Sequence, residues 1–592
     1  MGKKSSIMHS FRLFGNGIRI LFATSGLYGI LIIVLNIICG LIPPINSIVY
    51  QNLLDSIIEM VDAGKWISSG LFFLIMLSLL SIASFLLDGF IDFVKRVYSD
   101  KLDLHITEKV LHKSILLPMK TFDDAQIYNH INTAVARTSS SCLDLLEAIS
   151  ELVYSSVKGL SFLFIMLNFS WPIAVVSLIS MIPLLHLSVR INRYWYKIYF
   201  KRVEKNRLIQ YLKMLIVKNS CIKEIKLYNV GEKIIDFIVG NFTRFLSEDV
   251  KARKGFLRKK TFVQILDNAV TFGVKLWLLV LAINQGCSLG TIVLYFNALE
   301  ELKLSYNQFI RHFSTLQNSL QYLESLEILE CEKVEPTQEG KPFDHSFKEI
   351  EFRNVSFQYP GCEKYVLKDI SLTFKRGKTY FLVGFNGSGK TTLIKLLLRL
   401  YQPTEGQILI DGIDIQNVSL NQYYANISAI FQDFIEYPFD IYENVVVRDI
   451  DKNPDQFHTV LDEVGMHDFV NSLSNKEHTL LMRDWTGGID LSQGQWQKLA
   501  IARCIYGNSI ISILDEPFSS IDAEAENSII SNIRQHSDKN LMIFITHRFS
   551  SISRHDQIIV LKDGSIVEEG THAELIQNKN IYYRLYDSQK IE

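Results

Sequence analysis

Long apolar runs dominate the first half of the chain. Crossing a bilayer as a helix takes about 20 apolar residues, and six segments meet this requirement loosely. They are residues 20–48, 68–93, 145–169, 172–191, 262–283 and 289–310. The pattern predicts an all-α domain with six transmembrane spans over residues 1–329. A soluble helical bundle is the alternative, which the length of the runs disfavours.

The connections between these runs differ in length and charge. Residues 95–144 and 192–261 form two long connections rich in Lys and Arg, whereas the others are short or acidic. Because positively charged loops stay in the cytoplasm, both long connections and both chain ends are predicted to be cytoplasmic. The basic N-terminus and the length of the first run argue against a cleavable signal peptide. The N-terminal basic residues are Lys3, Lys4, Arg12 and Arg19.

Both long connections carry helical patterns without a spanning signal. We expect them to extend the membrane helices and to turn around short helices that touch the domain that follows. Residues 122–129 and 221–228 are the candidates for these two contacts. A plain helical turn remains the alternative at each place.

Two carboxylates fall inside the sixth run. With a rise of 1.5 Å per residue, Glu300 and Glu301 lie roughly 17 Å into the span that begins near residue 289. Charges at this depth are costly and usually functional. The hypothesis is that at least one faces a central cavity and meets positive charge on a substrate. The alternative is a Glu300–Lys303 pair one helical turn apart.

The composition changes after residue 329. Residues 330–346 are polar, contain two prolines and lack periodicity, which predicts a linker. Residues 347–592 have the composition of a soluble domain. The net charge of −1 gives no sign of nucleic-acid binding. The seven scattered cysteines favour reduced thiols over a disulfide framework.

A glycine-rich loop with a strand before it and a helix after it marks a phosphate-binding site. Residues 379–383 read as a buried strand and 393–400 as a helix, which is the context that identifies a P-loop. Backbone N–H groups and the helix dipole bind phosphates there, Lys390 reaches the β and γ phosphates, and Thr391 offers its hydroxyl to Mg²⁺. The nucleotide-binding residues of the loop are Gly384, Asn386, Gly387, Ser388, Gly389, Lys390, Thr391 and Thr392.

A second apolar strand, residues 510–514, ends in two carboxylates. Asp515 is placed to hold Mg²⁺, and Glu516 to polarise the attacking water as general base. A strand that merely ends in Asp-Glu-Pro is the alternative, which the P-loop disfavours.

Residues from about 349 to 592 resemble the nucleotide-binding domain of ATP-binding cassette (ABC) transporters. The resemblance implies that Tyr359 stacks on adenine, that Gln432 touches Mg²⁺ and water, and that His547 contacts the γ-phosphate. Residues 491–495 match the signature motif, and Asp522 belongs to a loop that crosses a dimer interface. The implied ligands are ATP and Mg²⁺. The implied nucleotide contacts beyond the P-loop are Tyr359, Ser492, Gly494, Gln495 and Asp522, with Thr391, Gln432 and Asp515 on the metal.

With six spans in front, the whole chain resembles an ABC exporter half-transporter: a helical membrane domain followed by an α/β P-loop ATPase domain. In that family the signature motif of one copy closes over ATP held by the other. The resemblance therefore implies two chains, and the complete motif set favours a homodimer. The sequence leaves a different partner chain open.

A narrower resemblance is to lantibiotic (nisin-type) peptide exporters without a peptidase domain. It is carried by residues 122–129, by 431–434 and by 494–498, where Trp496 replaces the Arg of many drug and lipid exporters. It implies export of a ribosomally made peptide across a bacterial plasma membrane, with separate modifying enzymes and leader peptidase. The alternatives are a multidrug or lipid exporter and, against the intact Glu516, an ATP-gated channel or regulator.

The chain departs from the family pattern at two positions. Thr486 stands where exporters commonly have a carboxylate before the signature motif, which puts that route of coupling in doubt. Gln493 stands where the consensus has glycine. We expect Gln493 to tune the site without disabling it.

Overall fold

The structure is a computed structural model that describes residues 3–64, 68–336, 340–447, 453–535 and 539–589. The side chains of Lys3, Lys4 and Arg12, and residues 337–339 of the predicted linker, lie outside the described part. The chain divides into two compact units. The first comprises Met1–Ile115 and Asn129–Glu332, and the second Leu116–Tyr128 and Lys333–Glu592.

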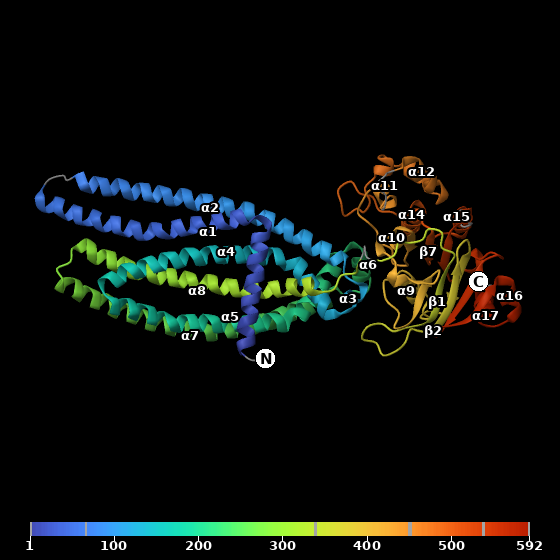
Figure 1. The fold of residues 1–592 in the computed structure, drawn as a ribbon, viewed down its shortest axis with the longest axis horizontal. Helices are drawn as coiled ribbons and strands as arrows, with labels where there is room; N and C mark the ends of the chain where they lie inside the picture. The colour runs from blue at the N-terminus through green and yellow to red at the C-terminus, as the bar shows by residue number, and fades with distance from the viewer. Residues whose placement is uncertain (1–2, 65–67, 337–339, 448–452, 536–538, 590–592) are drawn as a thin grey trace. The chain divides into compact units, whose positions relative to one another are not determined.

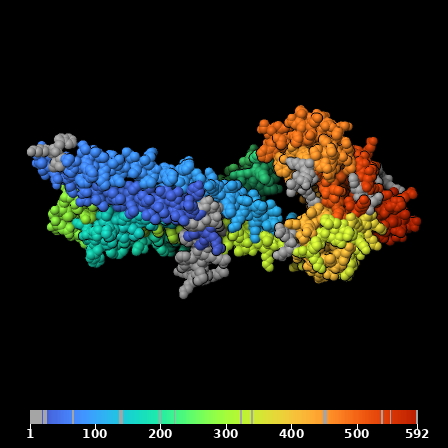
Figure 2. All heavy atoms as spheres, turned by 45° about the horizontal axis from the view of Figure 1, so that its top comes forward, coloured from blue at the N-terminus to red at the C-terminus, as the bar shows by residue number. Residues whose placement is uncertain are grey.

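Long helices build the first unit (Figure 1). Helix α1 packs along α2, where the blue and lighter blue atoms adjoin in Figure 2, and also against α8, while α5 packs against α7 and α8. These helices continue well beyond the apolar runs, so the expected helical extensions are present. The helices are α1 (Lys3–Ala63), α2 (Ser68–Ile115), α4 (Ala125–Phe169), α5 (Trp171–Val217), α6 (Asn219–Leu227), α7 (Gly231–Asn284) and α8 (Leu289–Cys331).

Among the described residues, five helices are long and apolar enough to cross a membrane. They contain the first five predicted spans. The sixth predicted span lies on α8 as a continuous helix, but α8 is not one of the five. The charged side chains of Glu300, Glu301 and Lys303 lower the hydropathy of this part of α8, so its crossing stays a prediction.

The charges of α8 are paired with neighbouring helices. Lys275 Nζ of α7 lies 2.5 Å from Glu300 Oε1, and Lys158 Nζ of α4 lies 2.6 Å from Glu301 Oε2. The alternative of a Glu300–Lys303 pair is wrong, because Lys303 Nζ lies 2.7 Å from Asp267 Oδ2 of α7. Interhelical pairing satisfies charges that would be costly in lipid, and it fixes α8 against α4 and α7.

Two β-sheets form the centre of the second unit. One is antiparallel, in the order β2-β1-β4-β5; the other is mainly parallel, in the order β10-β9-β3-β8-β7-β6. The strands are β1 (Glu349–Phe357), β2 (Leu367–Lys375), β3 (Thr379–Gly384), β4 (Glu405–Ile410), β5 (Ile413–Asp414), β6 (Ile427–Ile430), β7 (Ile511–Asp515), β8 (Leu541–Ile545), β9 (Gln557–Lys562) and β10 (Ser565–Thr571).

The parallel strands at the centre are buried along their whole length. Every residue of β3, β7 and β8 is buried, as expected for strands covered by helices on both faces. The helices of this unit are α3 (Met119–Asp123), α9 (Lys390–Leu397), α10 (Leu420–Ala425), α11 (Ile441–Val445), α12 (Pro454–Glu463), α13 (His467–Ser472), α14 (Gln493–Tyr506), α15 (Ala523–Gln535), α16 (His572–Asn578) and α17 (Ile581–Gln589).

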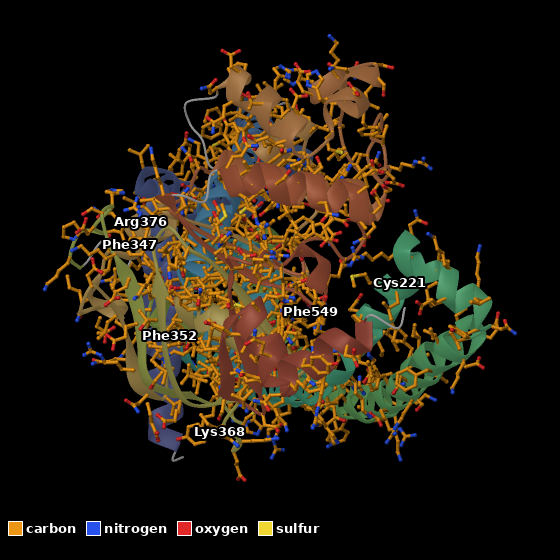
Figure 3. The ribbon with its side chains drawn as sticks, turned by 90° about the vertical axis from the view of Figure 1, so that its right-hand side faces the viewer. Cys221, Phe347, Phe352, Lys368, Arg376 and Phe549 are labelled. Atoms are coloured by element: carbon orange, nitrogen blue, oxygen red, sulfur yellow. The ribbon has the colours of Figure 1, made fainter. Side chains whose placement is uncertain are left out.

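Aromatic side chains pack the antiparallel sheet. Phe352 of β1 meets Phe374 of β2 edge to face, with ring centroids 6.0 Å apart. The guanidinium of Arg376 lies 5.7 Å from the ring centroid of Phe347, and Figure 3 labels Phe347, Phe352 and Arg376 on this part of the molecule. These aromatic side chains belong to a core that the antiparallel sheet shares with α9 and one face of the parallel sheet, and Tyr359 packs against this core.

Candidate nucleotide-binding and catalytic site

Glycines shape the phosphate loop between β3 and α9. Gly384 has a φ of 154°, and a Cβ there would lie 2.2 Å from the carbonyl oxygen of Leu561 in β9. Gly389 caps α9 with a φ of 106°, and its Cβ would lie 2.6 Å from a methyl group of Leu367. The loop can therefore close against β9 and β2 only without side chains at these two positions.

The loop offers positive charge and free hydrogen-bonding capacity. Lys390 is 6% exposed, and its Nζ donates to the carbonyl oxygens of Gly384 (2.8 Å) and Phe385 (3.1 Å). Burial lowers the pKa of Lys390, against the opposing effect of Glu516 and Asp515. The buried hydroxyl of Ser388 has no hydrogen-bond partner within the described residues. Asn386 and Gly387 are exposed at the tip of the loop. These features fit a polyphosphate.

A hydroxyl and a buried carboxylate meet behind the loop. Thr391 Oγ1 donates to Asp515 Oδ2 at 3.0 Å, and Asp515, the last residue of β7, is 2% exposed. Burial raises the pKa of Asp515 to about 6, although the hydrogen bond from Thr391 acts in the opposite direction. Hard oxygen donors of this kind suit Mg²⁺, so the residues present fit the metal that the sequence predicts.

Glu516 lies between two partners from other strands. Its Oε2 accepts from Gln432 Nε2, which follows β6, at 3.2 Å. Its Oε1 lies 3.3 Å from Nε2 of His547, which follows β8. The φ of Glu516 is 48°, a conformation that non-glycine residues adopt at a cost and that is enriched at functional sites. Burial lowers the pKa of His547, and the charge of Lys390 lowers it further, whereas Glu516 raises it.

Tyr359 lies next to the loop on the antiparallel sheet side. Its hydroxyl is 3.1 Å from Thr392 Oγ1, in the first turn of α9. Its ring packs edge to face against Phe357 and Tyr401, with centroid distances of 5.0 Å and 5.3 Å. This aromatic cluster holds the tyrosine beside the phosphate loop, where the sequence predicts adenine.

The signature residues begin helix α14. Ser492 caps the helix and forms a reciprocal capping box with Gln495. A Cβ on Gly494 would lie 2.8 Å from the carbonyl oxygen of Ser520, so glycine allows a close approach to residues 519–522. The contacts described for these signature residues are with their own helix start and residues 519–522, and not with the phosphate loop. Gln493 and Thr486 are both exposed.

Trp496, which contributes to the resemblance to lantibiotic exporters, lies in the interior of the ATPase domain. It is 5% exposed and belongs to the core that α14 shares with the parallel sheet. Its ring therefore contributes to packing.

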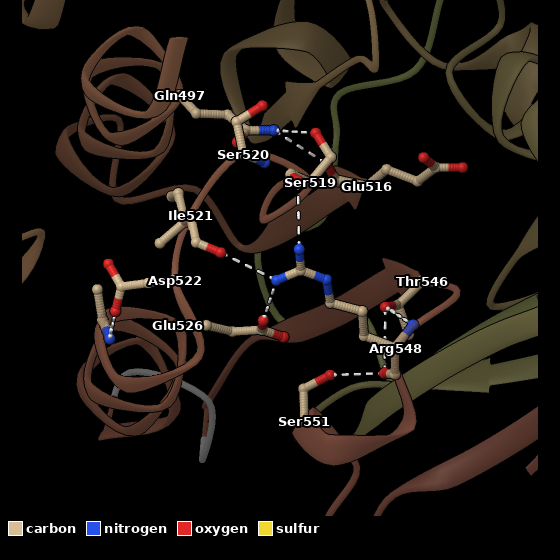
Figure 4. Close-up of polar contacts among 11 residues, drawn as sticks. Gln497, Glu516, Ser519, Ser520, Ile521, Asp522, Glu526, Thr546, Arg548 and Ser551 are labelled. Atoms are coloured by element: carbon tan, nitrogen blue, oxygen red, sulfur yellow. Dashed lines mark hydrogen bonds and ion pairs between the residues drawn. The ribbon is translucent and has the colours of Figure 1, made fainter. Parts of the chain in front are cut away.

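Residues 519–522 are held by two side chains that sequence reasoning missed. Gln497 Nε2 donates to Ser519 Oγ at 2.6 Å, and Arg548 donates to the carbonyl oxygens of Ser519 and Ile521 (Figure 4). Asp522 is exposed and caps α15 by accepting from the N–H of Ala525 at 2.9 Å. The available sequence signals were the position of Arg548 directly after His547 and that of Gln497 within residues 494–498.

Residues 122–129, the first segment predicted to touch the ATPase domain, make this contact through Asp123. Tyr401 donates from its hydroxyl to Asp123 Oδ2 at 2.7 Å, and the N–H of Glu335 donates to the carbonyl oxygen of Leu116. Segment Leu116–Tyr128 accordingly belongs to the second compact unit. The second predicted segment, residues 221–228, lies on α6 and at its end within the first unit, so its contact stays a prediction.

Removing the Tyr401–Asp123 hydrogen bond in the intact chain tests whether it holds residues 119–128 in place. Tyr401→Phe removes one hydrogen bond to a charged group, which should raise amide hydrogen exchange in residues 119–128 by about tenfold. Tyr365→Phe is the matched control, because Tyr365 donates to Glu405 at 2.9 Å on the exposed surface of the same domain. Equal exchange in both variants would show that Tyr401 does not hold the segment.

Comparisons with known proteins agree with this geometry. Residues 30–296 match the ABC transporter transmembrane region, and residues 367–519 match the ABC transporter domain. The chain is 30% identical to the subtilin transport ATP-binding protein SpaT of Bacillus subtilis, over 94% of this chain and 90% of that protein.

Two further likenesses extend over nearly the whole chain. The nisin transport ATP-binding protein NisT of Lactococcus lactis subsp. lactis is 28% identical over 97% of this chain and 96% of its own. A solved bacterial Atm1-family ABC exporter with ATP bound aligns with a TM-score of 0.79 at 19% identity, covering 95% of this chain and 97% of that one. The chain belongs to the ABC transporter family as an exporter-type half-transporter, with a transmembrane domain followed by an ATPase domain.

Proposed function

We propose that this ABC exporter uses ATP hydrolysis to move a ribosomally synthesised, lantibiotic-like peptide out of a bacterial cytoplasm. The observation that carries the catalytic part is Glu516, held at 3.2–3.3 Å from Gln432 and His547 beside the phosphate loop. The peptide part is supported by the relatives whose names give subtilin and nisin transport. Separate modifying enzymes and a leader peptidase would act on the same peptide.

The residues of the site take distinct roles in this proposal. Tyr359 stacks on adenine, and Lys390 with the N–H groups of the loop binds the β and γ phosphates. Thr392 binds near the α-phosphate. Thr391, Gln432 and Asp515 would hold Mg²⁺, which neutralises phosphate charge when bound. Glu516 accepts the proton of the attacking water, while His547 donates to the γ-phosphate.

A second copy of the chain completes each ATP site. Ser492 donates to the γ-phosphate of ATP held by the partner, and Gly494 permits the close backbone approach that this requires. Gln495 and Asp522 face the same ATP across the interface. Both halves of the site are intact in one chain, which supports a homodimer. Each site then closes only when the two ATPase domains meet.

Transport follows by alternating access. ATP binding closes the two ATPase domains and opens the membrane domains to the outside, and hydrolysis resets them. The positive-inside pattern supports a cytoplasmic location for both termini and the ATPase domain of a plasma-membrane protein. A multidrug or lipid exporter would use the same cycle, so the cargo requires its own test.

The role of Glu516 predicts a large and specific loss. Glu516→Gln should lower steady ATP hydrolysis by roughly 10²- to 10⁴-fold, because the general base is removed. ATP binding should be retained and measured by equilibrium binding of labelled ATP. Glu524→Gln is the control, since Glu524 is an exposed carboxylate on α15. Hydrolysis at the wild-type rate in Glu516→Gln would refute the assignment.

The cargo can be tested in inside-out vesicles. We expect ATP-dependent uptake of a cationic, lantibiotic-type precursor peptide and little uptake of a lipophilic dye. Uptake of the dye but not of the peptide would favour the multidrug alternative. ATP-dependent ion current without accumulation of either molecule would favour the channel.

Variants of Glu300 and Glu301 on α8 test whether the transported peptide is cationic. Glu300 already faces Lys275, and Glu301 faces Lys158, so a cationic peptide would have to compete with these lysines. Glu300 is the more accessible of the two, at 49% exposure of its side chain against 31%. Glu300→Gln should reduce uptake of a cationic peptide about tenfold relative to a neutral analogue. Unchanged uptake in Glu300→Gln, Glu301→Gln and the double variant would remove this part of the proposal.

A further inference from the structure

Arg548 connects three groups through one guanidinium. Its Nη1 donates to the carbonyl oxygen of Ile521 at 3.0 Å and to Glu526 Oε2 at 2.8 Å. Its Nη2 donates to the carbonyl oxygen of Ser519 at 3.2 Å (Figure 4). The side chain thus reaches from the residue after His547 to both ends of the 519–521 segment.

Glu526 explains why an arginine is required at this place. It lies on α15 and is 1% exposed, and a buried carboxylate needs a charged partner. Arg548 supplies the charge, and its remaining N–H groups bind the two carbonyl oxygens. A guanidinium has five donors in a fixed plane, so it can serve all three acceptors at once, whereas an ammonium group is a single point of contact.

Helix α14, which begins with the signature residues, also holds residues 519–521. Gln497 of α14 donates to Ser519 Oγ at 2.6 Å and accepts from the N–H of Ser520 at 2.8 Å. Ser519, Ser520 and Asp522 are exposed, while Ile521 is 4% exposed and packs in the core. Residues 519–522 therefore form an exposed loop whose backbone is fixed by α14 and by Arg548.

We propose that Arg548 is a positioning residue that links the two ATP sites of the dimer. The inference rests on the proposed function, in which His547 contacts the ATP of its own chain and residues 519–522 face the ATP of the partner. A shift of the backbone at His547 would move the guanidinium of the next residue. That guanidinium holds two carbonyl groups of the loop that faces the other site, so occupancy of one site would set the geometry of the second.

The closest matched control is Arg534 in the same domain. Its Nη2 donates to the carbonyl oxygen of Ser551 at 2.9 Å and to Asp556 Oδ2 at 2.6 Å. Asp556 is 6% exposed, so Arg534 also joins a buried carboxylate to a backbone carbonyl. These partners of Arg534 lie in residues 551–556 and not in the 519–522 loop.

The experiment compares Arg548→Lys with Arg534→Lys in the full-length chain in lipid. Both variants keep a positive charge beside the buried carboxylate, so thermal unfolding should shift equally in the two. ATP hydrolysis is measured against ATP concentration, and we expect cooperative kinetics for wild type and Arg534→Lys. For Arg548→Lys we expect turnover about tenfold lower, the size of one lost charge-assisted hydrogen bond. We also expect a Hill coefficient close to 1 and, in the Glu516→Gln background, unchanged equilibrium binding of ATP.

A third variant separates the loop contact from charge burial. Glu526→Gln leaves both carbonyl groups available to Arg548 and should keep the cooperative kinetics. Loss of cooperativity in Glu526→Gln to the same degree as in Arg548→Lys would overturn the proposal, as would identical kinetics for Arg548→Lys and Arg534→Lys. A wild-type chain that does not hydrolyse ATP would overturn the proposed function itself, which distinguishes that failure from a failure of the role of Arg548.

Discussion

The backbone of Glu516 is the constraint on which the catalytic arrangement depends. Its N–H continues the pairing of β7 by donating to the carbonyl oxygen of Ile545 in β8 at 3.0 Å. The positive φ of 48° then turns the chain out of the sheet at this residue. Such a conformation costs on the order of 1 kcal/mol or more, so buried strands on both sides must hold it. The result is a carboxylate fixed between Gln432 and His547.

The parallel sheet makes this gathering possible. Lys390, Gln432, Glu516 and His547 follow four different strands, β3, β6, β7 and β8, whose carboxyl ends lie at one edge. Ligands of open α/β sheets bind at this edge. The signature residues begin a different element, α14, and their described contacts are with residues 519–522. An ATP site that needs both the residues at the strand ends and the signature residues is therefore consistent with two chains, each supplying one of the two groups.

Sequence motifs identified the residues that gather at this edge of the sheet, but they did not identify the side chains that support them. The P-loop, Asp515, Glu516 and His547 are found from local motifs, because each lies at the end of a recognisable strand. The predicted helix after the loop began at residue 393, whereas α9 begins at Lys390, since polar residues in its first turn hide the apolar pattern. It ends at Leu397 because Arg399 adopts a φ of 56°.

Local sequence patterns could not predict which residues from distant segments of the chain contact one another. Tyr401 and Asp123 are separated by 278 residues, and Glu301 pairs with Lys158 on another helix. Nothing in the spacing of these residues identifies the partner. The predicted linker likewise began at residue 330, although α8 continues to Cys331. Trp496 illustrates the converse, because a residue that helps to recognise relatives is buried and serves packing.

The central claim is that two copies of the chain share each ATP site, and cross-linking tests it most directly. One tagged chain would carry Phe385→Cys at the exposed tip of the phosphate loop, and a differently tagged chain Gln493→Cys at the signature motif. Both would carry Glu516→Gln, with the exposed cysteines Cys331 and Cys362 replaced by serine. The account predicts a disulfide-linked product that bears both tags and forms only when Mg²⁺ and ATP are added. Absence of that product, or the same yield without ATP, would contradict it.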